Sequence, residues 1–204
     1  MTATEENPES WETRTHVWAI AVDPEHLDHV RAVAGPIDSH HSALEVLAYA
    51  DDEAEALGRI GTVRVTITNS TISVDDDGRG TETRVTENGA IVRKPVMSSK
   101  DVRFYGSDAA PLLPDGVRRR GMSTVSAVSE MLVHVNHRES RSWSQAYRYG
   151  VPDDDLAEIE FRGHSGTTVT FSADDATAID LGRLSNLAMA FAHLDITFID
   201  ARTP

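Results

Sequence analysis

The sequence predicts an α+β fold in which helices cover one face of a mixed, mostly antiparallel sheet. Runs rich in β-branched and aromatic residues follow one another along much of the chain. Segments with the 3.6-residue spacing of amphipathic helices lie before, between and after these runs. The 204 residues, 40% of them hydrophobic, suffice for one domain with a full core.

The expected helices are bounded by start and stop signals. Pro24 suits the first turn of a helix that Gly35 and Pro36 would end. Ser42 can cap the next helix, which Gly58 would close. The four helices predicted in this way are Pro24–Ala34, Ala43–Leu57, Gly121–Met131 and Ile179–Leu194.

The expected strands leave one long segment without a clear pattern. The predicted strands are His16–Val22, Thr62–Thr68, Thr71–Val74, Leu132–His137, Ser142–Tyr149, Ala157–Phe161, Thr167–Phe171 and Ile196–Ala201. Residues 1–15 are polar and acidic, which predicts a disordered tail before a domain that spans residues 16–204. Residues from about 81 to 120 predict a lid, or a segment with a short helix around Val96–Lys100.

Composition excludes several classes of function. The net charge of −14 disfavours direct binding to nucleic acid or to an anionic membrane. No apolar run is long enough to cross a bilayer, and the N-terminus lacks the features of a signal peptide, so we expect a cytoplasmic protein. The absence of cysteine excludes disulfides and thiolate metal sites. Neighbours on a helix point about 100° apart, so His40 and His41 predict no shared metal ion.

Two segments carry the polar groups that suggest a binding site. On the second helix, Glu45, Tyr49 and Asp52 form a line opposite the apolar stripe, with Glu53 beside them. These acids are either solvated or present a carboxylate to a ligand, and spacing alone does not decide. In the segment Asp75–Gly80, glycines allow the backbone to approach a flat partner, and an aspartate can accept a hydrogen bond from an exocyclic amine.

Segments spread along the chain match one known family in the same order. They are LDHVRAVAGPI at Leu27–Ile37, EVLAYADDEAEA at Glu45–Ala56, ISVDDDGRG at Ile72–Gly80, YGVP at Tyr149–Pro152, GTTVTF at Gly166–Phe171, and RLSNLAMAFAHLDITFIDAR at Arg183–Arg202. In these segments the chain resembles the N-terminal ATPase domain of the DNA gyrase B subunit and topoisomerase IV, which belongs to the GHKL superfamily. The resemblance covers about residues 24 to 202.

The resemblance implies a two-layer α/β sandwich of the Bergerat type that binds ATP between its helices and a mobile lid. By this resemblance, Glu45 would be the general base that activates the attacking water. Asp76 would accept a hydrogen bond from the adenine amino group. The other ATP-binding positions that the resemblance implies are Gly80 beneath the ring, Thr167 beside the aspartate, the ion pair of Glu53 and Arg79, Asp52, and Arg138, where aminocoumarin inhibitors make contact.

The chain departs from the family where the metal and the phosphates bind. Tyr49 replaces the magnesium-binding asparagine, and a phenol is a poor substitute for an amide oxygen. The phosphate loop, GGLHGVG in the family, is DGVRRRG here and keeps only Gly116 and Gly121. ATP is therefore the expected ligand, no metal-ligating residue is assigned, and the binding of Mg²⁺ is left open.

The three arginines of this loop, Arg118, Arg119 and Arg120, have two interpretations. They are either solvated and paired with neighbouring acids, or they hold phosphates in place of the missing backbone amides and the metal. The second interpretation explains why positive charge stands just before a helix.

These observations predict adenine-nucleotide binding with impaired or lost hydrolysis. One alternative is a slow or partner-activated magnesium-dependent ATPase. Another is a non-enzymatic interaction protein related to gyrase, such as a decoy. The expected partners are the nucleotide, gyrase or another protein, and a second copy of the chain. Because no transducer, Toprim or cleavage-tyrosine segment is recognised, we do not expect a complete topoisomerase.

Overall fold

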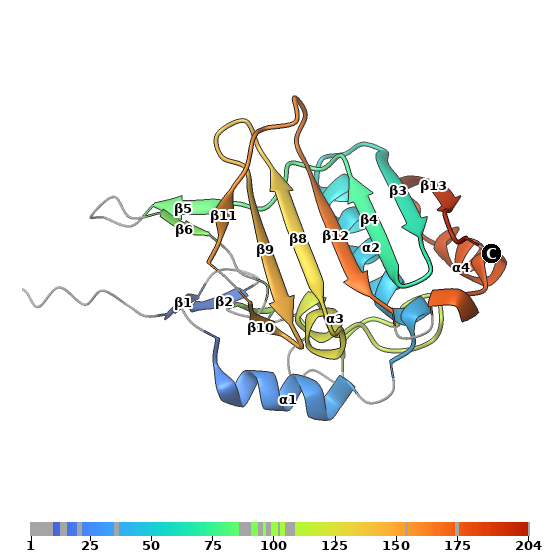
Figure 1. The fold of residues 1–204 in the computed structure, drawn as a ribbon, viewed down its shortest axis with the longest axis horizontal. Helices are drawn as coiled ribbons and strands as arrows, with labels where there is room; N and C mark the ends of the chain where they lie inside the picture. The colour runs from blue at the N-terminus through green and yellow to red at the C-terminus, as the bar shows by residue number, and fades with distance from the viewer. Residues whose placement is uncertain are drawn as a thin grey trace, which may run out of the picture.

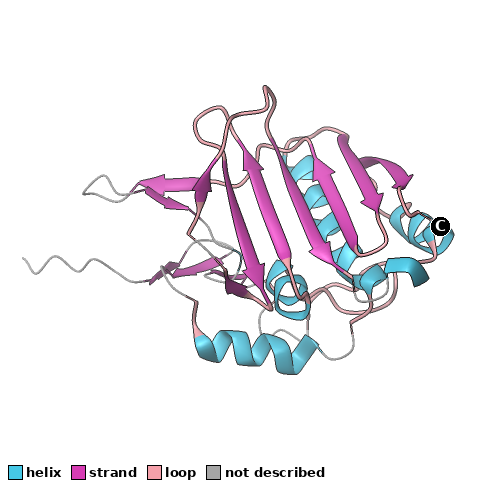
Figure 2. Cartoon of the chain, in the orientation of Figure 1, coloured by secondary structure: helices cyan, strands magenta, loops and turns pink. Residues whose placement is uncertain are grey.

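The computed structural model describes residues 10–12, 16–19, 22–34, 37–85, 91–93, 96, 99–101, 103–104, 109–153, 155–173 and 176–203. Its main feature is an eight-stranded sheet with helices on one face, which confirms the predicted α+β class (Figures 1 and 2). The strand order is β10 (Val151–Pro152), β9 (Trp143–Arg148), β8 (Leu132–His137), β12 (Gly166–Ser172), β4 (Thr71–Asp76), β3 (Gly61–Ile67) and β13 (Leu194–Asp200), with β11 (Ala157–Glu158) also pairing with β9. Among the described strands of this sheet, only β13, which runs parallel to β3, breaks the antiparallel pattern.

The described helices are α1 (Pro24–Ala34), α2 (Ser39–Ala56), α3 (Met122–Val128) and α4 (Leu181–Ala188). The predicted cap at Ser42 is wrong, because α2 begins one turn earlier, where the Asp38 side chain accepts a hydrogen bond from the His41 N–H at 2.8 Å. Both α3 and α4 are shorter than predicted. Within the described residues, no helix has the length and apolar composition that crossing a bilayer requires.

The core lies between α2 and the centre of the sheet. Leu44 and Leu47 of α2 are fully buried, and so are alternate residues of β3 and β4 such as Val65 and Ile72. This alternation follows from the period of two in a strand, which gives the sheet one apolar face. Glu45 and Tyr49 of α2 instead contact the loop before α3 and the first residue of α3.

Smaller strands occupy segments for which the sequence predicted something else. In the predicted tail, Ser10–Glu12 form β1, which pairs with β2 (His16–Ala19), while residues 1–9 and 13–15 lie outside the described residues. The predicted short helix around Val96–Lys100 is wrong for its last residues, because Ser99–Asp101 form the strand β7, which pairs with β2. The expected lid also contains a hairpin of β5 (Thr83–Val85) and β6 (Ile91–Arg93). Apart from β2 and β11, the predicted strands agree with the structure within two residues at each end.

Candidate functional site

Asp76 ends β4 with its side chain on the helix-covered face of the sheet. One carboxylate oxygen, Oδ1, accepts hydrogen bonds from the Gly78 N–H at 2.8 Å and from the Thr167 N–H at 3.2 Å. Burial raises the pKa of Asp76 to about 6, although these two N–H groups act in the opposite direction. Neither bond uses the second oxygen, Oδ2, so the carboxylate can accept a further hydrogen bond.

Two glycines, one after β4 and one at the start of β12, fit closely against their neighbours. Gly80 has φ +75°, and a Cβ there would lie 2.6 Å from Asn136 Oδ1 and 2.8 Å from the His137 carbonyl oxygen. Gly166 has φ +147°, and a Cβ there would collide with the carbonyl oxygen of Asp76. Only glycine therefore fits these two positions without displacement of the neighbouring backbone.

An ion pair forms one edge of this region, as the resemblance implied. Arg79 donates from Nε to one oxygen of Glu53 at 2.6 Å and from Nη2 to the other at 2.9 Å. Partial burial raises the pKa of Glu53. The hydrogen bonds from Arg79 and the charge of Arg138 lower it by more, so the pKa lies below its ordinary value. Arg138 also lies beside Gly80, since a Cβ on that glycine would be 2.9 Å from Cγ of Arg138.

A row of polar side chains continues from Asp76 across the sheet. Thr167, Asn136 and Trp143 occupy successive strands in register with it. The Nδ2 atom of Asn136 and the Nε1 atom of Trp143 are buried and have no hydrogen-bond partner among the described residues. Asn136 and Trp143 were not predicted as site residues from the sequence, because their alignment depends on strand register.

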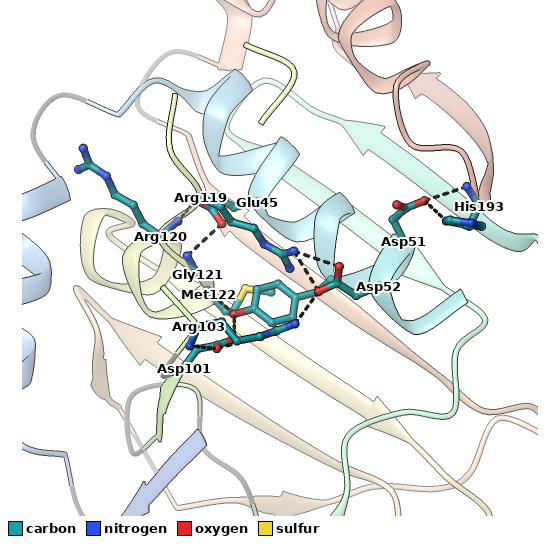
Figure 3. A network of polar contacts seen from close by, with 11 residues as sticks. Glu45, Asp51, Asp52, Asp101, Arg103, Arg119, Arg120, Gly121, Met122 and His193 are labelled. Atoms are coloured by element: carbon teal, nitrogen blue, oxygen red, sulfur yellow. Dashed lines mark hydrogen bonds and ion pairs between the residues drawn. The ribbon is translucent and has the colours of Figure 1, made fainter. Parts of the chain in front are cut away.

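Glu45 lies at the centre of a buried charge cluster. Its two carboxylate oxygens accept hydrogen bonds from the backbone N–H groups of Arg120 at 2.5 Å and Gly121 at 3.0 Å (Figure 3). One turn earlier on α2, His41 Nε2 lies 3.3 Å from Glu45, and His41 Nδ1 lies 2.7 Å from Asp115. Glu45 is fully buried, so the interpretation of this residue as a solvated surface acid is wrong.

His41 was not identified from the sequence, although the His-x-x-x-Glu spacing of one helical turn was a usable signal. Burial lowers the pKa of His41, but the carboxylates of Glu45 and Asp115 outweigh it and raise the pKa above the ordinary value. The protonated imidazole therefore links helix α2 to the loop that contains Asp115.

We expect the free energy of unfolding to fall as the pH rises above about 6.5. A histidine with a raised pKa stabilises the folded state fully below its unfolded pKa of about 6.5, and this contribution is lost as the pH rises through the higher folded value. Denaturant unfolding of the wild type and of His41→Gln across this range measures the effect. The wild-type curve should fall more steeply than that of the variant, and parallel curves would contradict the assignment. The range lies above the pKa of Asp76, which therefore does not contribute.

The three arginines of the loop point to different places, so neither interpretation holds for the run as a whole. Arg118 is exposed and donates to the Ala110 carbonyl oxygen at 3.0 Å. The side chain of Arg120 points away from Glu45 (Figure 3). Arg119 turns inward and is only 5% exposed. Gly116 lies in a turn with open space around it, away from these contacts.

The guanidinium of Arg119 packs against two aromatic rings. Its central carbon is 4.7 Å from the centroid of the Tyr49 ring and 4.5 Å from that of Phe104. Its Nη1 atom pairs with both oxygens of Asp52, at 3.1 and 2.9 Å. Arg103 also pairs with Asp52, at 3.0 Å, so the carboxylate is shared between two guanidinium groups.

The residues around Tyr49 do not fit a magnesium ion. Burial raises the pKa of Tyr49 further above its ordinary value, so its oxygen is a neutral phenol. That oxygen donates to Asp101 at 3.1 Å, and the charges closest to the ring include the guanidinium groups of Arg119 and Arg103. Among the described residues, no group of three or more histidine, aspartate or glutamate side chains is placed to hold a metal.

Known proteins resemble this chain over most of its length, although no family model matches it. The chain is 31% identical to the B subunit of DNA topoisomerase 4 from Mycoplasma genitalium over 176 residues. It is 30% identical to the B subunit of DNA gyrase from Mycobacterium leprae over 174 residues. Each alignment covers 80% of this chain, which spans 28% and 25% of the length of these relatives. The chain belongs to the gyrase B-like GHKL domains.

A solved structure has the same fold as this GHKL domain. It is the topoisomerase IV ATP binding domain of Francisella tularensis in complex with a small-molecule inhibitor. The TM-score is 0.66 at 21% sequence identity, and the superposition covers 92% of this chain and 93% of the other. The domain therefore has the two-layer architecture that the sequence predicted.

Within this GHKL domain the predicted site residues form two groups. One group surrounds Asp76, and the other surrounds Glu45. The first contains Gly80, Thr167, Glu53, Arg79 and Arg138, and the second contains Asp52, Arg119 and Gly121. Arg118 and Gly116 make none of the contacts given for either group, and Thr167 contacts Asp76 through its backbone N–H.

Proposed function

We propose that this domain binds ATP through its adenine base at Asp76 and hydrolyses it slowly or not at all. The observation that supports adenine binding best is the geometry of the Asp76 carboxylate. Two backbone N–H groups fix one oxygen, and the second oxygen is left to accept a hydrogen bond. The segment from about residue 81 to 120, with its β5–β6 hairpin, would be the lid over the ligand.

The chemistry of Asp76 favours adenine over guanine. A carboxylate only accepts hydrogen bonds, so it pairs with the exocyclic amine of adenine. Guanine carries a carbonyl oxygen at the corresponding ring position, which would face the carboxylate as a second acceptor. A site built on a buried acceptor rejects such a ligand because its polar groups are then left unpaired.

Impaired hydrolysis is supported by the contacts of Glu45. A general base must lie within hydrogen-bond reach of the water that it activates. Here both oxygens of Glu45 accept from backbone N–H groups, and His41 lies beside one of them. Phosphoryl transfer also depends on positioned positive charge along the phosphates, and the residues around Tyr49 do not fit the usual magnesium ion.

Titration calorimetry with adenosine, ADP, ATP and GTP tests the proposed base specificity. All three adenine ligands should bind, and GTP should bind about tenfold more weakly or worse, since one unpaired buried group costs about 1–3 kcal/mol. Equal affinity for ATP and GTP would contradict the role of Asp76. No binding of any adenine ligand would favour the alternative of an interaction protein or decoy, with gyrase, another protein or a second copy of the chain as its partner.

A slow or partner-activated ATPase is the second candidate. The contact between His41 and Glu45 favours it, because a charged imidazole one helical turn away orients a carboxylate that could serve as a base. In that case a partner would have to release Glu45 from the N–H groups of Arg120 and Gly121.

A further inference from the structure

We propose that the Arg119 guanidinium binds the terminal phosphates of the nucleotide in place of a divalent cation, so that binding does not require Mg²⁺. This inference rests on the proposed function, because it concerns the phosphate end of the same ligand. It follows from a group in this region that is charged, buried and incompletely paired. The resemblance alone would place a metal here, and the residues do not fit one.

The unpaired edge of Arg119 is complementary to an oxyanion. Nη1 is paired with Asp52, but Nε and Nη2 are buried and have no hydrogen-bond partner among the described residues. These two atoms lie on the same edge of the guanidinium and donate in parallel, which matches two oxygens of a phosphate or carboxylate. A buried guanidinium with two unpaired N–H donors destabilises the folded domain, and a bound oxyanion would remove this destabilisation.

The surroundings hold this edge in place. The rings of Tyr49 and Phe104 pack against the guanidinium and limit its movement. Arg119 also immediately precedes Arg120, whose N–H contacts Glu45, and Tyr49 follows Glu45 by one turn of α2. The unpaired edge therefore belongs to the same group of residues as the carboxylate that the resemblance assigns to catalysis.

Asp52 pairs with Nη1, next to the unpaired edge of Arg119, so its negative charge would repel a phosphate bound at that edge. Its side chain is 35% exposed, and its carboxylate is shared between Arg119 and Arg103. When a phosphate binds Arg119, Asp52 can remain paired with Arg103 and can also be solvated, so no buried charge is left alone. Asp52 would thus weaken phosphate binding in the free domain, and its neutralisation should strengthen it.

The test is calorimetric titration of the whole chain with ATP and with adenosine in EDTA. The wild type should bind ATP about tenfold more tightly than adenosine, as a hydrogen-bonded charge pair implies, and excess Mg²⁺ should change this ratio little. Arg119→Gln should bind adenosine like the wild type but lose the preference for ATP. Arg118→Gln removes a neighbouring arginine that contacts Ala110 instead, and it should behave like the wild type.

Three further results complete the test. Inorganic pyrophosphate in EDTA should compete with ATP and not with adenosine, which identifies the phosphates as the bound group. Asp52→Asn should bind ATP more tightly and adenosine unchanged, and this result does not depend on the folding of Arg119→Gln. Wild-type protein that binds adenosine but prefers ATP only with Mg²⁺, or Arg119→Gln that keeps the preference in EDTA, would overturn this inference alone. Wild-type protein that binds neither ligand would overturn the proposed function as well.

Discussion

Asp76→Asn is expected to weaken the binding of ATP and of adenosine by about 10- to 100-fold, equivalent to about 1–3 kcal/mol. The asparagine keeps an oxygen for the N–H groups of Gly78 and Thr167, but it turns an amide N–H₂ toward the adenine amine. Asp77→Asn is the matched control, since Asp77 is the next residue and pairs instead with Arg59 at 2.9 Å. Equal binding of adenosine by the two variants would rule out Asp76 as the base-recognising group.

The pH dependence of binding gives a second test of the same residue. Burial raises the pKa of Asp76 to about 6, and only the charged carboxylate has both oxygens available as acceptors. Affinity for adenosine should therefore be constant above pH 7 and decrease as the pH falls through about 6. The affinity of Asp76→Asn should not change over this interval. A wild-type profile that is flat from pH 7 to 5 would show that another group binds the amine.

Glu45→Ala is expected to lower the free energy of unfolding by about 3–5 kcal/mol, the usual effect of removing one partner from a buried ion pair. The change leaves a buried His41 without its nearest carboxylate on α2 and leaves two backbone N–H groups unpaired. Glu55→Ala on the same helix is the control, because Glu55 is exposed and its loss should change stability by less than about 0.5 kcal/mol. Urea denaturation of the three proteins measures both values. Equal stability of the two variants would mean that Glu45 has no structural role.

The arrangement of residues around Asp76 was predictable because its determinants are local. Asp76, Gly78 and Gly80 are close in sequence, and a strand followed by a glycine-rich turn fixes their relative positions. The pair of Glu53 and Arg79 was correct for a related reason, since the resemblance supplied the long-range contact that spacing does not give. The fold class followed from periodicity, which depends on burial alone.

The surroundings of Arg119 and Glu45 were not predictable in their details. Arg119 is held by Phe104 and Tyr49, and Phe104 comes from a segment whose sequence shows no periodic pattern. The adjacent Arg118 instead bonds to the Ala110 carbonyl oxygen, so neighbours in the sequence have different surroundings. The burial of Glu45 also depends on the loop before α3, which lies far from α2 in the sequence. Such contacts arise from tertiary packing, and local propensity does not encode them.

The most direct test of these proposals is the rate of phosphate release from saturating ATP with Mg²⁺ by the unmodified chain. We propose that the adenine end is competent, that Glu45 has a structural role and that the Arg119 guanidinium takes the place of a metal. ATP should therefore bind, and phosphate release should not exceed the rate of Glu45→Ala. A brisk Mg²⁺-dependent release that Glu45→Ala abolishes would contradict this expectation and would establish the domain as an ATPase.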